Sequence, residues 1–327
     1  TQFGVITEPE LGGVIVQIYN RQPKLFLETG VNYKDYLTRE FTKNIFQKRL
    51  NRILREQNTP LFSISVGTQD LTDNEEMYHA SAHVKEDDFE RGIKFLLTEI
   101  ERVKQNGFVE DELKLAKKDK LLSLEISLTQ KNTTKSRDLL DEYKSHFLEK
   151  EMVSGIDYEF ELAKQVIKTI KLEDINNFFL KFYQPDDRII LIKGPEKYKD
   201  LITKEMFLNY ESEIAKTKTL KADFALASKK LINKKLTGSK IVKEIKYPNL
   251  DITELHLANG VKVFLKPTKF KEKEFSFNAR SPGGFSHIPL PKLYSAQNAQ
   301  RIVNDSGLGS FTRNEINYLY NPNFISI

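Results

Sequence analysis

The stretch SHFLEKEM, from Ser145 to Met152, comes within one residue of a zinc-binding pattern. In H-x-x-E-H on a helix, two histidines hold the metal and the glutamate between them polarises the attacking water. His146 and Glu149 have this spacing, but Lys150 stands where the second histidine is needed. An ammonium group repels Zn²⁺ unless it is deprotonated, and a working site also needs a third ligand. We therefore predict that His146 binds no metal.

The other four histidines do not predict a metal site either. His79 and His83 lie in HASAH, which has the pattern of a strand, so their Cα atoms would stand about 13 Å apart at about 3.3 Å per residue. That separation is too wide for one zinc with ligands at about 2.1 Å, so packing or solvent contact explains them better. His256 alternates with apolar residues and should lie on an exposed strand face, and His287 follows a glycine pair in an expected loop. We predict no catalytic, metal-binding or cofactor-binding residue in this chain.

Two glycine-containing stretches resemble nucleotide-binding loops only superficially. Residues 281–284, SPGG, are not followed by a lysine at Walker spacing or set between a strand and a helix. Residues 306–310, SGLGS, have the spacing G-x-G without the rest of a dinucleotide fingerprint, and a turn at a helix C-terminus is the simpler interpretation.

The composition is that of an ordinary globular protein. The sequence is 39% hydrophobic and 30% charged, and its 327 residues are enough to form two hydrophobic cores. The 51 basic and 46 acidic residues are interspersed, so the net charge of +5 indicates a solvated surface rather than nucleic-acid binding.

No apolar run approaches the roughly 18 residues of a membrane span. The absence of cysteine excludes disulfides, thiolate metal sites and cysteine nucleophiles, and fits either a cytoplasm or a periplasm. The N-terminus lacks a signal-peptide pattern and has the character of the start of a cut or processed chain, so it says nothing about export.

Hydrophobic periodicity predicts an α+β architecture up to about residue 210, with helices covering one face of a mainly antiparallel sheet. Alternating or β-branched runs predict strands at residues 12–20, 61–67, 77–84 and 188–195. Helical spacing predicts helices at residues 35–56, 87–105, 109–128 and 172–183. The near-zinc motif lies on a further helix, whose apolar stripe comprises Leu139, Leu140, Tyr143, Phe147 and Leu148.

The pattern changes near Tyr210. Residues 211–247 are lysine-rich with few large apolar side chains, which favours an extended connection, partly helical. Two alternating runs then flank Asn259-Gly260, a strong hairpin signal. EFSFNARSPGG, residues 274–284, predicts a third strand, residues 292–307 and 312–320 predict two helices, and the chain stops at an apolar tail, NPNFISI.

Several of these segments, in this order, resemble the second domain of pitrilysin/insulinase-type zinc peptidases. They are GFVEDELKLAK, YKSHFLEKE, IKLEDINNFFLKFY and QPDDRIILIKGP. ITELHLANGVKVFLKP is similar to the hairpin that opens another copy of the domain, and GLGSFTRNEINYLY is similar to the segment that follows in a third domain. The resemblance covers nearly the whole chain and lies in the order and character of segments rather than in a catalytic signature.

The resemblance implies a mitochondrial-processing-peptidase-like metallohydrolase domain plus a partial second copy. Family members have four homologous domains in two halves that close around a peptide. Residues 1–210 would be the non-catalytic second domain, 211–248 the interdomain connection, and 249–327 part of a degenerate third domain. The family's zinc motif would lie upstream of this chain. In the third domain the motif helix would be SAQNAQRI, with Gln297, Ala299 and Gln300 at the ligand and base positions, and none of them can replace histidine or carboxylate.

The function implied is the chamber wall and hinge of a zinc-dependent endopeptidase that encloses and hydrolyses peptides. Zinc would be bound by the parent protein, whereas this chain alone would be inactive and bind no cofactor. Its partners would be a peptide substrate and the missing zinc-binding first domain, with no nucleic acid. The alternative is a non-catalytic family relative that acts as a structural or peptide-binding partner subunit. For a bacterial parent, the periplasm or cell envelope is favoured and the cytoplasm is an alternative.

A partial third domain predicts exposed apolar surface, because a complete domain closes its sheet with further elements. The residues expected to lack cover are Phe264, Phe275, Phe277, Ile316, Leu319, Phe324 and Ile325. Such surface usually binds a partner, and a homodimer through residues 249–327 is one way to cover it.

Overall fold

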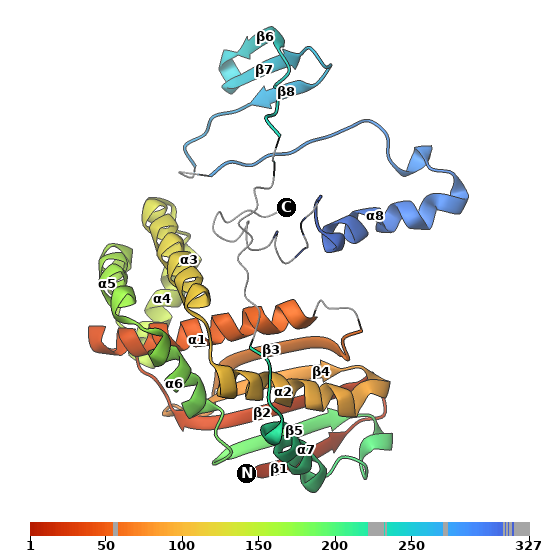
Figure 1. Ribbon diagram of the computed structural model, residues 1–327. Helices are drawn as coiled ribbons and strands as arrows, with labels where there is room; N and C mark the ends of the chain where they lie inside the picture. Colours follow the sequence, from red (N-terminus) through yellow and green to blue (C-terminus); the bar gives the residue numbers. More distant parts are fainter. Residues whose placement is uncertain are drawn as a thin grey trace. The chain divides into compact units, whose positions relative to one another are not determined.

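The computed structural model describes residues 1–54, 58–221, 232, 234–270, 274–309, 311, 313 and 316. The chain divides into two compact units (Figure 1). Unit 1 comprises residues 1–124 and 136–225, and unit 2 comprises residues 125–135 and 226–327. Each unit is described separately below.

Unit 1 is built on a five-stranded mixed sheet with the strand order β1-β5-β2-β4-β3. The strands are β1 (Gln2–Thr7), β2 (Val14–Pro23), β3 (Leu61–Asp70), β4 (Glu75–Val84) and β5 (Arg188–Gly194). β1 and β5 are parallel, and every other neighbouring pair is antiparallel. The N-terminal strand β1 was not predicted, because its six residues follow no clear alternation and its pairing partner β5 lies far along the chain.

Unit 1 has seven helices among its described residues. They are α1 (Gly30–Leu54), α2 (Phe89–Asn106), α3 (Glu110–Thr129, which continues into unit 2), α4 (Ser136–Glu149), α5 (Gly155–Thr169), α6 (Leu172–Phe182) and α7 (Lys204–Lys216). Of these, α1 and α2 pack directly on one face of this sheet, and α4 buries no residue. Figure 1 shows α1 and α2 running along the sheet. The buried positions alternate along the strands, as at Val14, Val16 and Ile18 of β2, and join helix residues in one core. The α+β fold expected from the sequence is confirmed, whereas helix α5 was missed.

Two close contacts fix how the helices lie on the sheet. At Gly92 of α2, an added Cβ atom would stand 2.1 Å from Cγ1 of Val84, so only glycine lets α2 lie this close to β4. An aromatic cluster joins α1 to α6: the Phe46 and Phe179 rings meet edge to face with centroids 5.1 Å apart, and Phe179 lies 4.4 Å from Tyr183. The first contact sets how closely α2 lies on β4, and the second holds α1 against α6.

Unit 2 contains a three-stranded antiparallel sheet and one long helix. The sheet has the order β6-β7-β8, from β6 (Ile241–Tyr247), β7 (Ile252–Leu257) and β8 (Lys262–Leu265), and the helix is α8 (Leu293–Ser306). The hairpin predicted around Asn259-Gly260 is confirmed as β7–β8. The third strand is a correction, since residues 274–284 form no strand and β6, inside the lysine-rich segment, pairs with β7 instead.

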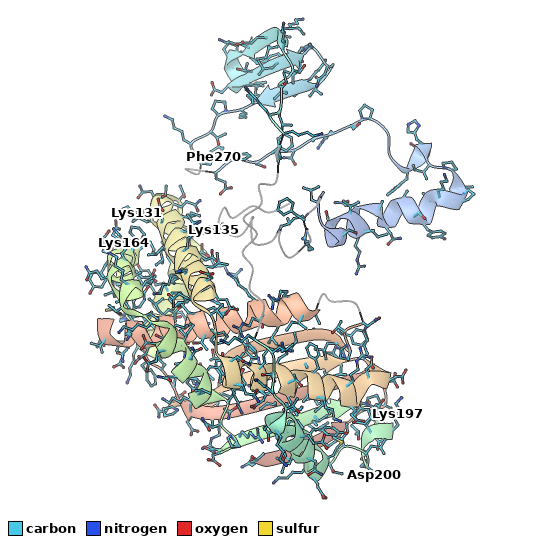
Figure 2. The ribbon with its side chains drawn as sticks, in the orientation of Figure 1. Lys131, Lys135, Lys164, Lys197, Asp200 and Phe270 are labelled. Atoms are coloured by element: carbon cyan, nitrogen blue, oxygen red, sulfur yellow. The ribbon has the colours of Figure 1, made fainter. Side chains whose placement is uncertain are left out.

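The exposed apolar residues expected in unit 2 are found in part. Phe264, Phe275 and Phe277 are largely exposed, and so is Phe270, labelled in Figure 2. Ile316 is a correction, because it is buried. Leu319, Phe324, Ile325 and most of the expected helix at 312–320 lie outside the described residues.

Short 3-10 helices complete the described structure, at Glu86–Asp88, Lys131–Thr133, Glu196–Tyr198, Pro248–Leu250, Phe285–His287 and Leu290–Lys292. Across the residues with described structure, no helix combines the length and apolar character needed to span a bilayer.

Candidate functional site

The near-zinc motif lies where helix α4 ends. Nδ1 of His146 donates a hydrogen bond to the carbonyl oxygen of Glu151 at 2.6 Å, which closes the turn after the helix. Lys150 has φ of 57°, in the left-handed region, so the helix stops at Glu149 and the position of the missing second histidine is outside it. The imidazole of His146 thus acts as a helix-ending group.

Glu149 is engaged by a lysine from elsewhere in the chain. Its Oε2 lies 3.3 Å from Nζ of Lys24, which is also 2.7 Å from Oδ2 of Asp70. The hydrogen bond that Lys24 donates to Asp70 is the main reason that the pKa of Lys24 is raised, and Glu149 adds to it. Among the described residues, no group of three or more His, Asp or Glu side chains could hold a metal ion. The absence of zinc from this chain stays a prediction.

The two histidines of β4 lie on the sheet face opposite the helices, here called the outer face. Paired residues of neighbouring strands cross this face in three rows: Gly67–His79–Tyr19–Ile189, Ser65–Ser81–Gln17–Leu191 and Ser63–His83–Ile15–Lys193. These side chains are half-buried or exposed, unlike the fully buried core positions between them. The outer face is therefore a mixed surface of aromatic, aliphatic and small polar groups.

His79 occupies the centre of one row. Its ring lies 5.9 Å from that of Tyr19 and covers Gly67, where an added Cβ atom would come within 2.8 Å of the imidazole. Partial burial lowers the pKa of His79, so the imidazole is neutral at pH 7. Its Nδ1 atom is buried with no hydrogen-bond partner in the described part of the chain. His83 packs instead against Phe62, with ring centroids 5.1 Å apart.

The candidates of unit 2 occupy separate places. Nε2 of His256 lies 2.8 Å from Oε1 of Glu254, whose Oε2 accepts a hydrogen bond of 2.7 Å from the Tyr247 hydroxyl, so His256 belongs to a small polar group that spans β6 and β7. His287 is exposed in a 3-10 turn. Gln297, Ala299 and Gln300 are exposed on α8 and offer amide and methyl groups rather than metal donors.

Sequence reasoning missed two features of unit 1. The ion pairs of Lys24 join it to Asp70 and Glu149, which are distant in the sequence, and no local pattern signals such contacts. The apolar stripe of α4 was correctly placed on a helix, but its exposure to solvent was not predicted. Helical spacing identifies such a stripe without identifying what covers it.

Comparison with known proteins connects this fold to zinc proteases. No family model matches the chain. A zinc protease PQQL-like protein of Arabidopsis thaliana is 26% identical over 314 residues, which are 94% of this chain and 29% of that protein. The probable zinc protease PqqL of Haemophilus influenzae is 22% identical over 303 residues, or 89% of this chain and 31% of that protein. The chain therefore spans less than a third of the length of these curated relatives.

Solved structures show the same fold. The periplasmic protease PqqL from Escherichia coli matches 99% of this chain with 36% of its own, at a TM-score of 0.65 and 17% identity. The ferredoxin protease FusC, solved as a point mutant in complex with Arabidopsis ferredoxin, matches 99% with 37% of its own, at a TM-score of 0.60 and 17% identity. The fold is that of the pitrilysin-type zinc proteases. In sequence, the chain is similar to the PqqL-like zinc proteases named above.

Proposed function

We propose that this chain is the chamber-wall and hinge portion of a zinc-dependent endopeptidase that encloses and hydrolyses peptides. One observation carries the proposal: E. coli PqqL matches 99% of the chain, including both units, with only 36% of its own length. A chain that corresponds to about a third of a protease, and offers no metal-binding group in its described residues, fits a supporting part better than a catalytic one. Zinc and the attacking water would be held by another part of the parent protein.

The outer face of the five-stranded sheet is the surface that we assign to the chamber wall. Its rows present mostly neutral imidazole, phenol, aliphatic, amide and hydroxyl groups, with Lys193 as their charged member, and such a surface can contact polypeptides of many sequences. The FusC structure, in which a related protease is in complex with ferredoxin, supports polypeptide binding by a protein of this fold.

Kinetics of the full-length gene product test this assignment. Tyr19→Ala with His79→Ala removes two neighbouring rings of the outer face, and Leu201→Ala, at an exposed residue after β5, is the control. For a quenched-fluorescence peptide we expect a KM increase of about five-fold or more in the double variant, with kcat and zinc content within about two-fold of wild type. An unchanged KM would mean that the outer face does not contact the substrate and is not part of the proposed chamber wall.

The alternative is a non-catalytic relative that serves as a structural or peptide-binding partner subunit. The absence of a metal-donor group from the described residues fits this alternative as well. Two observations distinguish the protease from the partner subunit: the coding sequence upstream of Thr1 and the metal content of the full-length product. An upstream H-x-x-E-H motif with one zinc per chain and peptide cleavage supports the protease, whereas a zinc-free product that binds peptides without cleaving them supports the partner subunit.

A further inference from the structure

Helix α4 of unit 1 presents an apolar stripe to solvent. Leu140 is 65% exposed and Phe147 is 83% exposed, and no residue of α4 is buried. The stripe consists of Leu139, Leu140, Tyr143, Phe147 and Leu148. Exposed apolar residues are ordinary when scattered, but five on one face of a 14-residue helix form a contiguous patch of the kind found at interaction sites.

The stripe continues into an open pocket of about 430 Å³ at the C-terminal end of α4. This volume is within the usual range for a binding pocket. Three apolar side chains line it, namely Phe26, Leu71 and Leu148, the last of which also belongs to the stripe. Its polar lining includes three carboxylates and one lysine: Asp70, Asp73, Glu149 and Lys24.

The stripe and pocket are locally acidic on a chain that is basic overall. Helix α4 carries the acidic residues Asp138, Asp141, Glu142 and Glu149 and the basic residues Arg137 and Lys144. The pocket adds Asp70 and Asp73 against Lys24, which its two ion pairs already engage. Helix α4 and the pocket lining together carry six carboxylates and three cations, and with the flanking Lys135, Lys150 and Glu151 the region stays net acidic, while the whole chain has a net charge of +5. The field at this surface attracts cations and repels anionic segments.

We propose that the α4 stripe and its pocket form a docking surface for a basic amphipathic polypeptide segment. Apolar side chains at helical spacing would cover Leu140, Tyr143 and Phe147, in the manner of a helix in a groove. A lysine or arginine of the segment would lay its aliphatic stem on Leu71 and Leu148 and place its cation near Asp73 and Glu149, which leaves the charged head partly solvated. This role goes beyond the chamber-wall function and holds whether or not the parent protein binds zinc.

Three labelled peptides of about 18 residues, long enough for five helical turns, test the charge and the pattern separately. The first has leucines at helical spacing with lysines on the opposite face, the second has glutamates in place of the lysines, and the third scrambles the first. Fluorescence anisotropy with the full chain should show the basic amphipathic peptide binding at least about ten-fold more tightly than either of the others at low salt. Raising the salt to about 1 M should reduce that preference for the basic over the acidic peptide. Equal affinity for the basic and acidic peptides would overturn the proposal.

Variants locate the binding on α4. Leu140→Ser with Phe147→Ser should weaken binding by about ten-fold or more, and Glu149→Gln by about three-fold with a smaller salt dependence. Leu140 and Phe147 are exposed, Glu149 is half-buried, and none of the three belongs to the hydrophobic core cluster, so the variants should remain folded. Leu201→Ser is the matched control at an exposed leucine outside the stripe. Binding that survives the double serine variant would overturn the proposal. So would a scattering mass showing that the free chain is a dimer that the same variant dissociates, since the occupant would then be a second copy.

Discussion

Replacing Glu112 by alanine should severely destabilise unit 1. The carboxylate of Glu112 lies at the start of α3 and receives two hydrogen bonds of 2.5 Å from Nε and Nη2 of Arg49 on α1. Both side chains are only 4% exposed. Glu112 also accepts a hydrogen bond from the backbone N–H of Val109, and the Arg49 guanidinium lies 4.9 Å from the centroid of the Phe108 ring. Truncating Glu112 would therefore leave the buried Arg49 cation without its ion-pair partner, beside the Phe108 ring.

The magnitude follows from the cost of an uncompensated buried charge. Breaking a buried ion pair from one side costs about 3–5 kcal/mol, whereas exchanging both partners for apolar residues is often close to neutral. We expect Glu112→Ala to reduce the free energy of unfolding by about 4 kcal/mol. Arg49→Met with Glu112→Leu should cost only about 1 kcal/mol, for the lost hydrogen bond to Val109. The interaction free energy between the Arg49 and Glu112 side chains should then be large and favourable.

Hydrogen exchange is the suitable assay, because a chain of two units need not unfold in one step. Protection of the α1 amides reports on unit 1 alone, and urea unfolding followed by circular dichroism gives a second measurement. Gln105→Ala is a control, since the Gln105 side chain bonds near α7 rather than α3. The reasoning fails if Glu112→Ala costs less than about 1 kcal/mol, or if the double variant is as unstable as the single one.

Elemental analysis of the purified chain should find no stoichiometric zinc, and one tightly held zinc that disappears in His146→Ala would contradict this. Limited trypsin digestion should cut first within residues 211–247, where apolar cover is scarce, so first cuts in the five-stranded sheet would count against that boundary. Burial lowers the pKa of His79 from 6.5, so this residue's contribution to stability is complete above pH 6.5 and lost as the pH falls through the folded-state pKa. His79→Gln should therefore weaken the fall in the urea midpoint on acidification, and an identical pH profile would exclude the effect. Residues 249–327 should exchange amide hydrogens faster than unit 1 or be held in a dimer, and a monomer with equal protection in both parts would refute this expectation.

Local patterns predicted most of unit 1. The runs at β2, β3, β4 and β5 alternate because one face is buried, and α2 repeats its apolar residues at helical spacing for the same reason. β1 escaped prediction because a short edge strand is defined by its partner β5, which it meets only after the chain has folded. Helix α5 was missed although its pattern was present: Ile156, Phe160, Ala163 and Ile167 recur at helical spacing and all pack in the core.

The candidate site was predictable only where a single residue type decides the chemistry. Lys150 excludes the second zinc ligand by its identity, and the sequence alone supports that argument. What His146 and Glu149 do instead depends on the Glu151 carbonyl and on Lys24, which the fold brings to them. The environment of His79 likewise arises from pairing with residues on neighbouring strands. Register between distant strands is a tertiary property, so no local spacing could supply it.

The same limit explains why the helix at α4 was predicted correctly, whereas the strand predicted at residues 274–284 was wrong. The α4 stripe has helical spacing and lies on a helix, whose backbone hydrogen bonds are formed within the segment itself rather than with another segment. Residues 274–277, EFSF, alternate as a strand does, yet Phe275 is 90% exposed and the segment pairs with no described strand. A strand requires a partner for its backbone, and β6 and β8 form the two edges of the sheet in unit 2. Binding along α4 should therefore leave secondary structure unchanged, whereas any partner that covers residues 274–277 should add strand content that circular dichroism can detect.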